Sequence, residues 1–334
     1  MAQPLTGMWL RHDKMISGLS GVSLPKSQKS SMADKIVRVL SIQSHVVSGY
    51  VGNKSACFPL QVLGFEVDTI NSVQFSNHTG YKHYKGQVLD DTQLGDLIDG
   101  LKSNGIDYYS HLLTGYIGSA SFLQKVKSVV EHLKTVNPNL IYVCDPVMGD
   151  NGKMYVPEEL LPVYRKDIIP LADIITPNQY EAELLSEQKI KNEEDAVAVM
   201  EWFHKQGVKT VVLSSTDLGS ESELLGMASS MINGSQNRLN VHIPRLPANF
   251  TGTGDLFAAL LLGWMHHTHN NLKKAVENTL NTMQAILRRT LDMAKVEAGT
   301  DSSLTVRHLE LKLVQSLNDI QNPKSKVKAT VLDN

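Results

Sequence analysis

Phe250-Thr251-Gly252-Thr253-Gly254-Asp255 leads directly into the apolar run Leu256-Phe257-Ala258-Ala259-Leu260-Leu261-Leu262-Gly263-Trp264. A run of this length with apolar residues on every side predicts a helix that is buried all round. The first N–H groups of a buried helix need partners, and the helix dipole attracts anions to that end. Glycines there let an anion approach the backbone closely. The stretch therefore predicts an anion site at the mouth of a buried helix.

Asp255 is the exceptional residue in this site, because its carboxylate repels an anion unless it has a chemical task. One interpretation is that the site transfers a phosphoryl group, with Asp255 as the general base for the attacking group. Gly252, Thr253 and Gly254 then hold the charge of the phosphate. The alternative is a glycine turn in which Asp255 is an ordinary first-turn carboxylate. The stretch alone favours neither.

The composition of the chain is that of an ordinary globular protein. Its 334 residues suffice for one large α/β domain or two small ones. The formal net charge of -2 argues against a nucleic-acid binder, and no apolar run has membrane-spanning length. Cys57 and Cys144 lie in apolar surroundings and predict buried reduced thiols, as expected for a cytoplasmic protein. Residues 1–35 lack a clear period, and we interpret them as a disordered or alternatively translated leader.

Strand-like and helix-like segments alternate through residues 36–334, which we expect to form a single domain. Residues 37–42 and 140–144 are continuous apolar runs that predict strands buried on both faces, as a parallel sheet requires. The order predicts an α/β fold with a mostly parallel central sheet and helices on both faces.

Two later segments predict antiparallel or edge strands. Residues 224–232 and 238–243 flank Asn233-Gly234 and predict a hairpin. The alternation of Leu309, Leu311 and Leu313 predicts a late edge strand.

Polar residues follow the ends of several predicted strands. Because the carboxyl ends of parallel strands meet at one edge of the sheet, we expect these residues to gather there. Asp145 and Asp150 follow a central strand. Two carboxylates near a phosphate site suggest that Mg²⁺ binds there, although a role in the turn is the simpler interpretation of Asp150. The members of this edge are Ser44, Thr114, Gly115, Tyr116, Asp145, Thr176, Ser214, Ser215 and Asp255.

Thr176-Pro177-Asn178-Gln179 fits a capping box headed by Thr176, with proline at the first helical position. Such a cap accounts for Thr176 and Gln179. It does not account for Asn178 and Glu181, which are able to hold water on a metal. From the local sequence, the cap alone is the simpler interpretation.

From Arg38 to Leu332 the chain resembles the pyridoxal kinase family of the ribokinase-like superfamily. The match is collinear and includes the loop on the vitamin side. The resemblance implies a ribokinase-like fold and ATP-dependent phosphorylation of the 5′-hydroxymethyl group of pyridoxal, pyridoxine and pyridoxamine in vitamin B6 salvage. The segments that carry it are residues 41–45, 71–81, 113–116, 143–150, Thr176-Pro177-Asn178-Gln179 with Glu181, and Gly252-Thr253-Gly254-Asp255.

The resemblance also implies roles for individual residues, with Asp255 as the base and Gly252, Thr253 and Gly254 as the anion hole. It implies MgATP (or Zn²⁺ in place of Mg²⁺), a monovalent cation such as K⁺, and a homodimer. Ser44, Val51, Phe75, Thr79 and Tyr116 resemble the pyridine pocket. The implied ATP-binding residues are Asp145, Tyr155, Asn178, Glu181, Ser214, Ser215, Leu246, Pro247, Ala248, Phe250 and Thr253, and the implied metal-site residues are Asp145, Asp150, Thr176 and Glu181.

Two other functions compete with this one. A hydroxymethylpyrimidine or sugar kinase would share the fold and differ in substrate, and the loop from Phe75 to Tyr81 together with Ser44 favours pyridoxal. A B6-binding protein without catalysis would not need Asp255.

Overall fold

A ten-stranded sheet runs through the part of the chain that the structure, a computed structural model, describes. The described residues are 37–334 without 151, 233, 300–302 and 333–334. Residues Val37–Asn334 form one compact unit. The leader expected over residues 1–35 lies outside the described residues.

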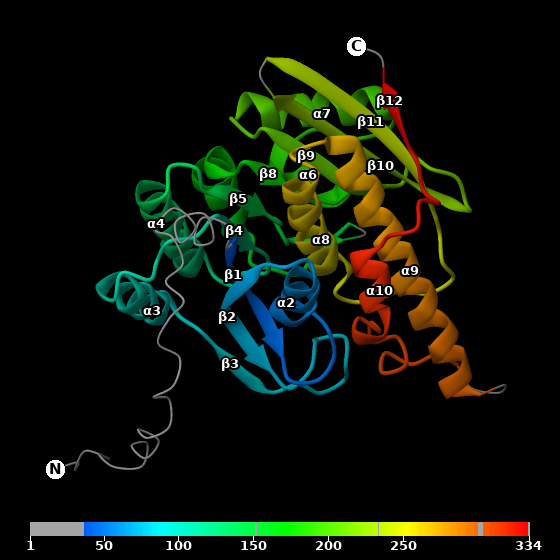
Figure 1. The fold of residues 1–334 in the computed structure, drawn as a ribbon, viewed down its shortest axis with the longest axis horizontal. Coiled ribbons are helices and arrows are strands. Elements are labelled where there is room, and N and C mark those ends of the chain that lie inside the picture. Colours follow the sequence, from blue (N-terminus) through cyan, green and yellow to red (C-terminus); the bar gives the residue numbers. More distant parts are fainter. Residues whose placement is uncertain (1–36, 151, 233, 300–302, 333–334) are drawn as a thin grey trace, which may run out of the picture. The chain divides into compact units, whose positions relative to one another are not determined.

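The strand order is β12-β11-β10-β9-β8-β5-β4-β1-β2-β3 (Figure 1). The six strands from β9 to β2 pair in parallel, whereas β3, β10, β11 and β12 pair antiparallel. The expected mostly parallel sheet is therefore confirmed, as is the hairpin of β10 and β11. The bounds are β1 Arg38–Val46, β2 Glu66–Phe75, β3 Gly86–Val88, β4 His111–Thr114, β5 Ile141–Cys144, β8 Ile174–Ile175, β9 Thr210–Thr216, β10 Glu223–Ile232, β11 Ser235–Pro244 and β12 Ala329–Leu332; a separate small hairpin joins β6 Gly149–Asp150 and β7 Lys153–Met154.

Helices cover both faces of the sheet, because neighbouring residues of the central strands point to opposite cores. Leu112 and Tyr142 belong to one core, and Leu113 and Val143 belong to the other. The first core is closed by α3 Asp91–Ser103, α4 Ala120–Val136, α5 Leu160–Val163, α6 Gln179–Ser186 and α7 Glu193–Lys205. The second is closed by α2 Asn53–Val62, α8 Thr253–His267, α9 Leu272–Ala298 and α10 Leu317–Gln321 (Figure 1).

Helix α8 is the buried helix that the sequence predicts. Its residues from Leu256 to Gly263 are all buried, and it packs against α2 and α9. No helix among the described residues is long and apolar enough to cross a membrane.

The late edge strand expected around Leu309, Leu311 and Leu313 is wrong. Leu311 and Leu313 are fully buried in the second core, but their backbone follows α9 instead of the sheet. The Lys312 N–H donates to Thr290 Oγ1 of α9 at 3.0 Å. The last described strand is β12, which pairs with β11. Alternating leucines indicate burial on one side, and they do not specify which backbone groups lie opposite.

Candidate active site

The mouth of α8 depends on a glycine in the left-handed region. Gly252 precedes the helix with φ 81°, and a Cβ there would lie 2.1 Å from the Tyr50 carbonyl oxygen. Ser55 Oγ donates to the Gly252 carbonyl at 3.2 Å. Only glycine accepts both this φ and this close approach of the Tyr50 backbone.

Asp255 lies in the first turn of α8 and is half-buried. Its Oδ2 accepts the Gly52 N–H at 2.8 Å, which fixes the carboxylate against the loop before α2. Burial raises the pKa of Asp255, and the Gly52 hydrogen bond opposes that rise. A carboxylate with a raised pKa is a better proton acceptor than an ordinary aspartate, so this geometry suits a general base.

Two other predicted residues lie beside this mouth. Gly52 packs against Ser44 at the end of β1, where a Cβ on Gly52 would lie 2.4 Å from Ser44 Oγ. Asp145, after β5, faces Gly254, and a Cβ on Gly254 would lie 3.6 Å from Asp145 Oδ2. The expected gathering of polar strand ends around Asp255 is therefore present for Ser44 and Asp145.

Asp145 and Glu181 are acids that the fold has nearly removed from solvent, at 5% and 3% exposure. Thr176 Oγ1 donates to Asp145 Oδ1 at 3.0 Å. The pKa of Asp145 lies well above its usual range, first because the group is buried and then because Glu181 and Asp255 carry like charge nearby. This excess of negative charge favours a bound cation.

The capping box of α6 has a different register from the one expected. Asn178, not Thr176, is the N-cap: its Oδ1 accepts the Glu181 N–H at 2.9 Å, and Glu181 Oε2 accepts the Asn178 N–H at 3.0 Å. Glu181 Oε1 also accepts the Met148 N–H at 2.9 Å. Burial raises the pKa of Glu181 even though these hydrogen bonds lower it. The Thr176 hydroxyl is used by Asp145, so the threonine has no part in the cap.

The donor atoms at this edge fit a hard cation that also binds phosphate and water. Among the described residues, no group of three or more His, Cys, Asp or Glu side chains has the arrangement of a metal site. The carboxylate of Asp145 and the hydroxyl of Thr176 are, however, oxygen donors of the kind Mg²⁺ takes when it keeps waters and substrate oxygens. Asp150, at the end of β6, contributes to the raised pKa of Glu181 through its like charge.

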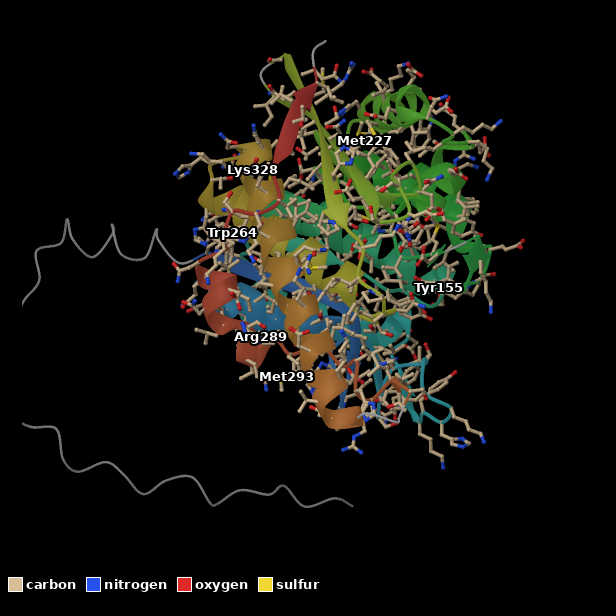
Figure 2. The ribbon with its side chains drawn as sticks, turned by 90° about the vertical axis from the view of Figure 1, so that its right-hand side faces the viewer. Tyr155, Met227, Trp264, Arg289, Met293 and Lys328 are labelled. Atoms are coloured by element: carbon tan, nitrogen blue, oxygen red, sulfur yellow. The ribbon has the colours of Figure 1, made fainter. Side chains whose placement is uncertain are left out.

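Tyr155 follows the β6–β7 hairpin and is 54% exposed. In Figure 2, Tyr155 and Trp264 lie on opposite sides of the view, and Trp264 is the residue near the carboxyl end of α8. Its pKa is raised, first by partial burial and then by Glu181 and Asp145. Tyr155 therefore lies close enough to these acids for their charges to act on it, and its role toward a nucleotide stays a prediction.

Phe75 and Tyr116, two of the predicted pyridine-pocket residues, each lie near Tyr84. The Phe75 ring lies 5.2 Å from the Tyr84 ring, and burial together with Tyr84 raises the pKa of Tyr116. Val51 is buried and Thr79 is exposed on the adjoining loop. Tyr84 is absent from the sequence prediction, because it lies in a loop without periodicity and only its packing on Phe75 reveals it.

The predicted nucleotide-side residues occupy two separate segments. Ser214 and Ser215 are half-buried on β9. Leu246 and Ala248 are half-buried after β11, Pro247 is exposed, and Phe250 packs against the second core. Their roles toward a nucleotide stay predictions.

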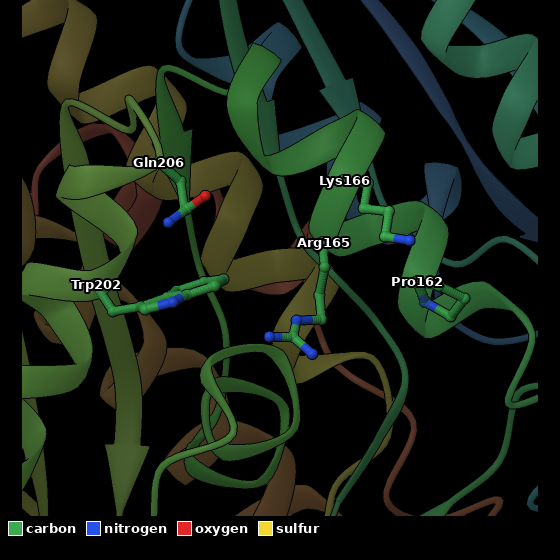
Figure 3. Close-up of a pocket in the computed structure, with 5 residues that line it drawn as sticks. All are labelled: Pro162, Arg165, Lys166, Trp202 and Gln206. Atoms are coloured by element: carbon green, nitrogen blue, oxygen red, sulfur yellow. The ribbon is translucent and has the colours of Figure 1, made fainter.

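Figure 3 shows a surface pocket of about 510 Å³. Arg165 is placed over the Trp202 ring at 5.9 Å, and the remaining lining residues are Pro162, Lys166 and Gln206. None of the predicted site residues lines it.

A family model described as phosphomethylpyrimidine kinase matches residues 72–301. The pyridoxal kinase of Sus scrofa is 53% identical over 311 residues, which cover 90% of this chain and 97% of the relative. The chain belongs to the pyridoxal kinase family. Pyridoxal kinase of Arabidopsis thaliana is 54% identical over 292 residues, covering 87% of this chain and 94% of the relative.

The solved pyridoxal kinase of Leishmania donovani in complex with ADP and pyridoxamine has the same fold. Its TM-score is 0.81 at 36% identity, with 89% of this chain and 99% of that chain covered. The ribokinase-like fold and the pyridoxal kinase family expected from the sequence are thus confirmed.

Proposed function

We propose that this protein transfers the γ-phosphate of ATP to the 5′-hydroxymethyl group of pyridoxal, and also of pyridoxine and pyridoxamine. The Leishmania donovani relative is described with ADP together with pyridoxamine or pyridoxine. The observation that carries the proposal is Asp255, held by the Gly52 N–H at the mouth of α8 and close enough to Asp145 for their charges to interact.

The reaction needs positioning and charge neutralisation more than covalent chemistry by the protein. Asp255 takes the hydroxymethyl proton while that oxygen bonds to the γ-phosphorus and the bond to the ADP oxygen breaks. The N–H groups at the start of α8 stabilise the negative charge that spreads over the transferred group. Asp145 and Thr176 are the residues that would hold Mg²⁺, which neutralises phosphate charge when it is bound with ATP.

Asp255→Ala and Asp255→Asn test the base. General-base catalysis contributes about 10²- to 10⁴-fold, so we expect kcat to fall by that factor in both variants. The asparagine oxygen can still accept the Gly52 N–H, so pyridoxal should bind Asp255→Asn with nearly unchanged Kd. The measurements are a coupled ATP assay and a pyridoxal binding titration. Unchanged turnover would remove the role of Asp255.

Hydroxymethylpyrimidine phosphorylation is the second candidate, because the matching family model carries the description phosphomethylpyrimidine kinase. The coupled assay with pyridoxal, pyridoxine, pyridoxamine and hydroxymethylpyrimidine separates the two functions. Far better turnover of the pyrimidine than of pyridoxal would favour the second candidate.

The resemblance supplies the remaining parts of the proposal. We propose Mg²⁺, or Zn²⁺ in its place, with ATP, a monovalent cation such as K⁺, a homodimer and a cytoplasmic location. The buried charge of Asp145 and Glu181 supports the divalent cation.

A further inference from the structure

We propose that Glu310 is a positioning residue for the vitamin side of the site. It connects the loop that carries Thr79 to the segment Tyr50–Gly52, which holds Asp255. Glu310 lies outside every sequence segment that carries the family resemblance. The proposal rests on the function proposed above and extends it to the C-terminal part of the chain.

The Glu310 carboxylate joins two loops that are far from it in sequence. Its Oε2 accepts the Tyr50 N–H at 3.1 Å, and its Oε1 accepts the Tyr81 hydroxyl at 2.9 Å. His78 Nε2 lies 3.3 Å from the same Oε1. His78 Nδ1 accepts the Gly80 N–H at 3.1 Å, which leaves the ring proton on Nε2, facing Glu310. One side chain therefore serves three donors.

The fold leaves a space for this carboxylate at a glycine. Gly49 has φ 92°, and a Cβ there would lie 2.4 Å from both carboxylate oxygens of Glu310. Glu310 is itself only 16% exposed, and His78 is 5% exposed. The contact is thus a packed, partly buried junction, and not a fully exposed ion pair of little energetic value.

The segment that directly follows Glu310 is anchored to the second core and to α9. Leu311 and Leu313 are fully buried, and Lys312 N–H is held by Thr290 of α9. Further along, Arg289 of α9, which is labelled in Figure 2, donates from its Nε to Ser316 Oγ at 3.0 Å. A carboxylate mounted on an anchored segment can restrain the two loops whose N–H and O–H groups it accepts.

The restraint reaches Asp255 through three consecutive residues. Glu310 holds the Tyr50 N–H, the Tyr50 carbonyl packs against Gly252, and the Gly52 N–H holds Asp255. The same carboxylate fixes Tyr81, two residues after Thr79. Loss of Glu310 should therefore loosen the vitamin loop and the support of Asp255 together, and leave the nucleotide side unchanged.

The charges at the junction keep it assembled near neutral pH. Burial raises the pKa of Glu310, but the hydrogen bonds from His78 and Tyr81 outweigh it, so the pKa is lowered overall and the group stays ionised. Burial and the Glu310 contact raise the pKa of Tyr81 to about 12, so its hydroxyl stays a donor.

Glu310→Gln is the decisive variant, because a single amide oxygen cannot accept from all three donors. We expect KM for pyridoxal to rise about tenfold, as for a lost hydrogen bond to a charged group, while KM for ATP stays within twofold. Tyr81→Phe should raise KM for pyridoxal less, and should add little in the Glu310→Gln background, since both changes remove the same contact.

Glu297→Gln is the matched control. Glu297 pairs with Lys312 at 3.3 Å, two residues from Glu310, and has none of the loop contacts of Glu310. Its KM for pyridoxal should equal that of the wild type. A merely structural role for Glu310 would lower the Tm of Glu310→Gln and leave the ratio of its KM for pyridoxal to its KM for ATP as in the wild type.

The proposal is overturned if folded Glu310→Gln keeps KM for pyridoxal within twofold of wild type, or if KM for ATP rises equally. If Glu310→Gln does not fold, Tyr81→Phe decides by the same criterion. A wild type without turnover of pyridoxal would instead overturn the proposed function, so the two failures are distinguishable.

Discussion

Replacing Gly252 by alanine tests how the mouth of α8 is built. The new Cβ would meet the Tyr50 carbonyl oxygen at 2.1 Å, and the backbone has φ 81°. Tyr50 cannot move freely, because the N–H two residues later holds Asp255. The substitution should therefore damage both stability and catalysis.

The stability loss has two separable parts. A non-glycine residue in the left-handed region costs about 1–2 kcal/mol, and overpacking against a backbone atom adds about 1–3 kcal/mol. With a few degrees of Tm for each kcal/mol in a domain of this size, Gly252→Ala should lower Tm by about 10 °C.

Gly64→Ala is the matched control for the first part. Gly64 has φ 88°, and a Cβ there would meet nothing within 4 Å. Gly64→Ala should carry only the cost of a non-glycine residue in the left-handed region, which lowers Tm by about 4 °C, and it should keep the wild-type kcat. Gly252→Ala should lose at least about tenfold in kcat as well, because the carboxylate of Asp255 is displaced.

Thermal unfolding and the coupled ATP assay on both variants decide the outcome. Equal Tm losses would show that the close approach of Tyr50 has no energetic consequence. Wild-type kcat in folded Gly252→Ala would show that the Tyr50–Gly52 segment does not position the base.

Two more predictions concern the acids and the cap. The raised pKa values of Asp145 and Asp255 mean that, above the ordinary carboxyl pKa of about 4, the folded ligand-free protein binds more protons than the unfolded chain. Its free energy of unfolding should therefore fall as pH rises. Between pH 6 and pH 8 the Tm of Asp145→Asn should fall less than the Tm of the wild type. A fall equal to or larger than that of the wild type would contradict the charge cluster. Asn178→Ala should lower the free energy of unfolding by about 1 kcal/mol through loss of the α6 cap, as measured by denaturant unfolding. Asn178→Asp should keep the cap and most of this stability. Equal losses of stability in the two variants would argue against the cap.

The parts of the site that the sequence predicts are those with a local signature. The glycines and Asp255 stand next to an apolar run, and Asp145 follows a continuous apolar strand, so spacing alone places them at a helix mouth and a strand end. Tyr84, His78 and Glu310 have no such signature. Each is identified by a partner that is distant in sequence or lies in an irregular loop.

The sequence by itself determined the parallel sheet and the buried helix with glycines and an aspartate at its mouth, because burial imposes a period on the residues of each element. Only the tertiary structure decided the register of the α6 cap, the course of the segment around Leu311 and the three donors that meet at Glu310. Those features depend on which hydrogen-bonding groups face each other after the chain has folded. A linear pattern records how a residue is buried, whereas it does not record the partner of a polar group, and the donors that meet at Glu310 lie more than 200 residues away from it in the chain.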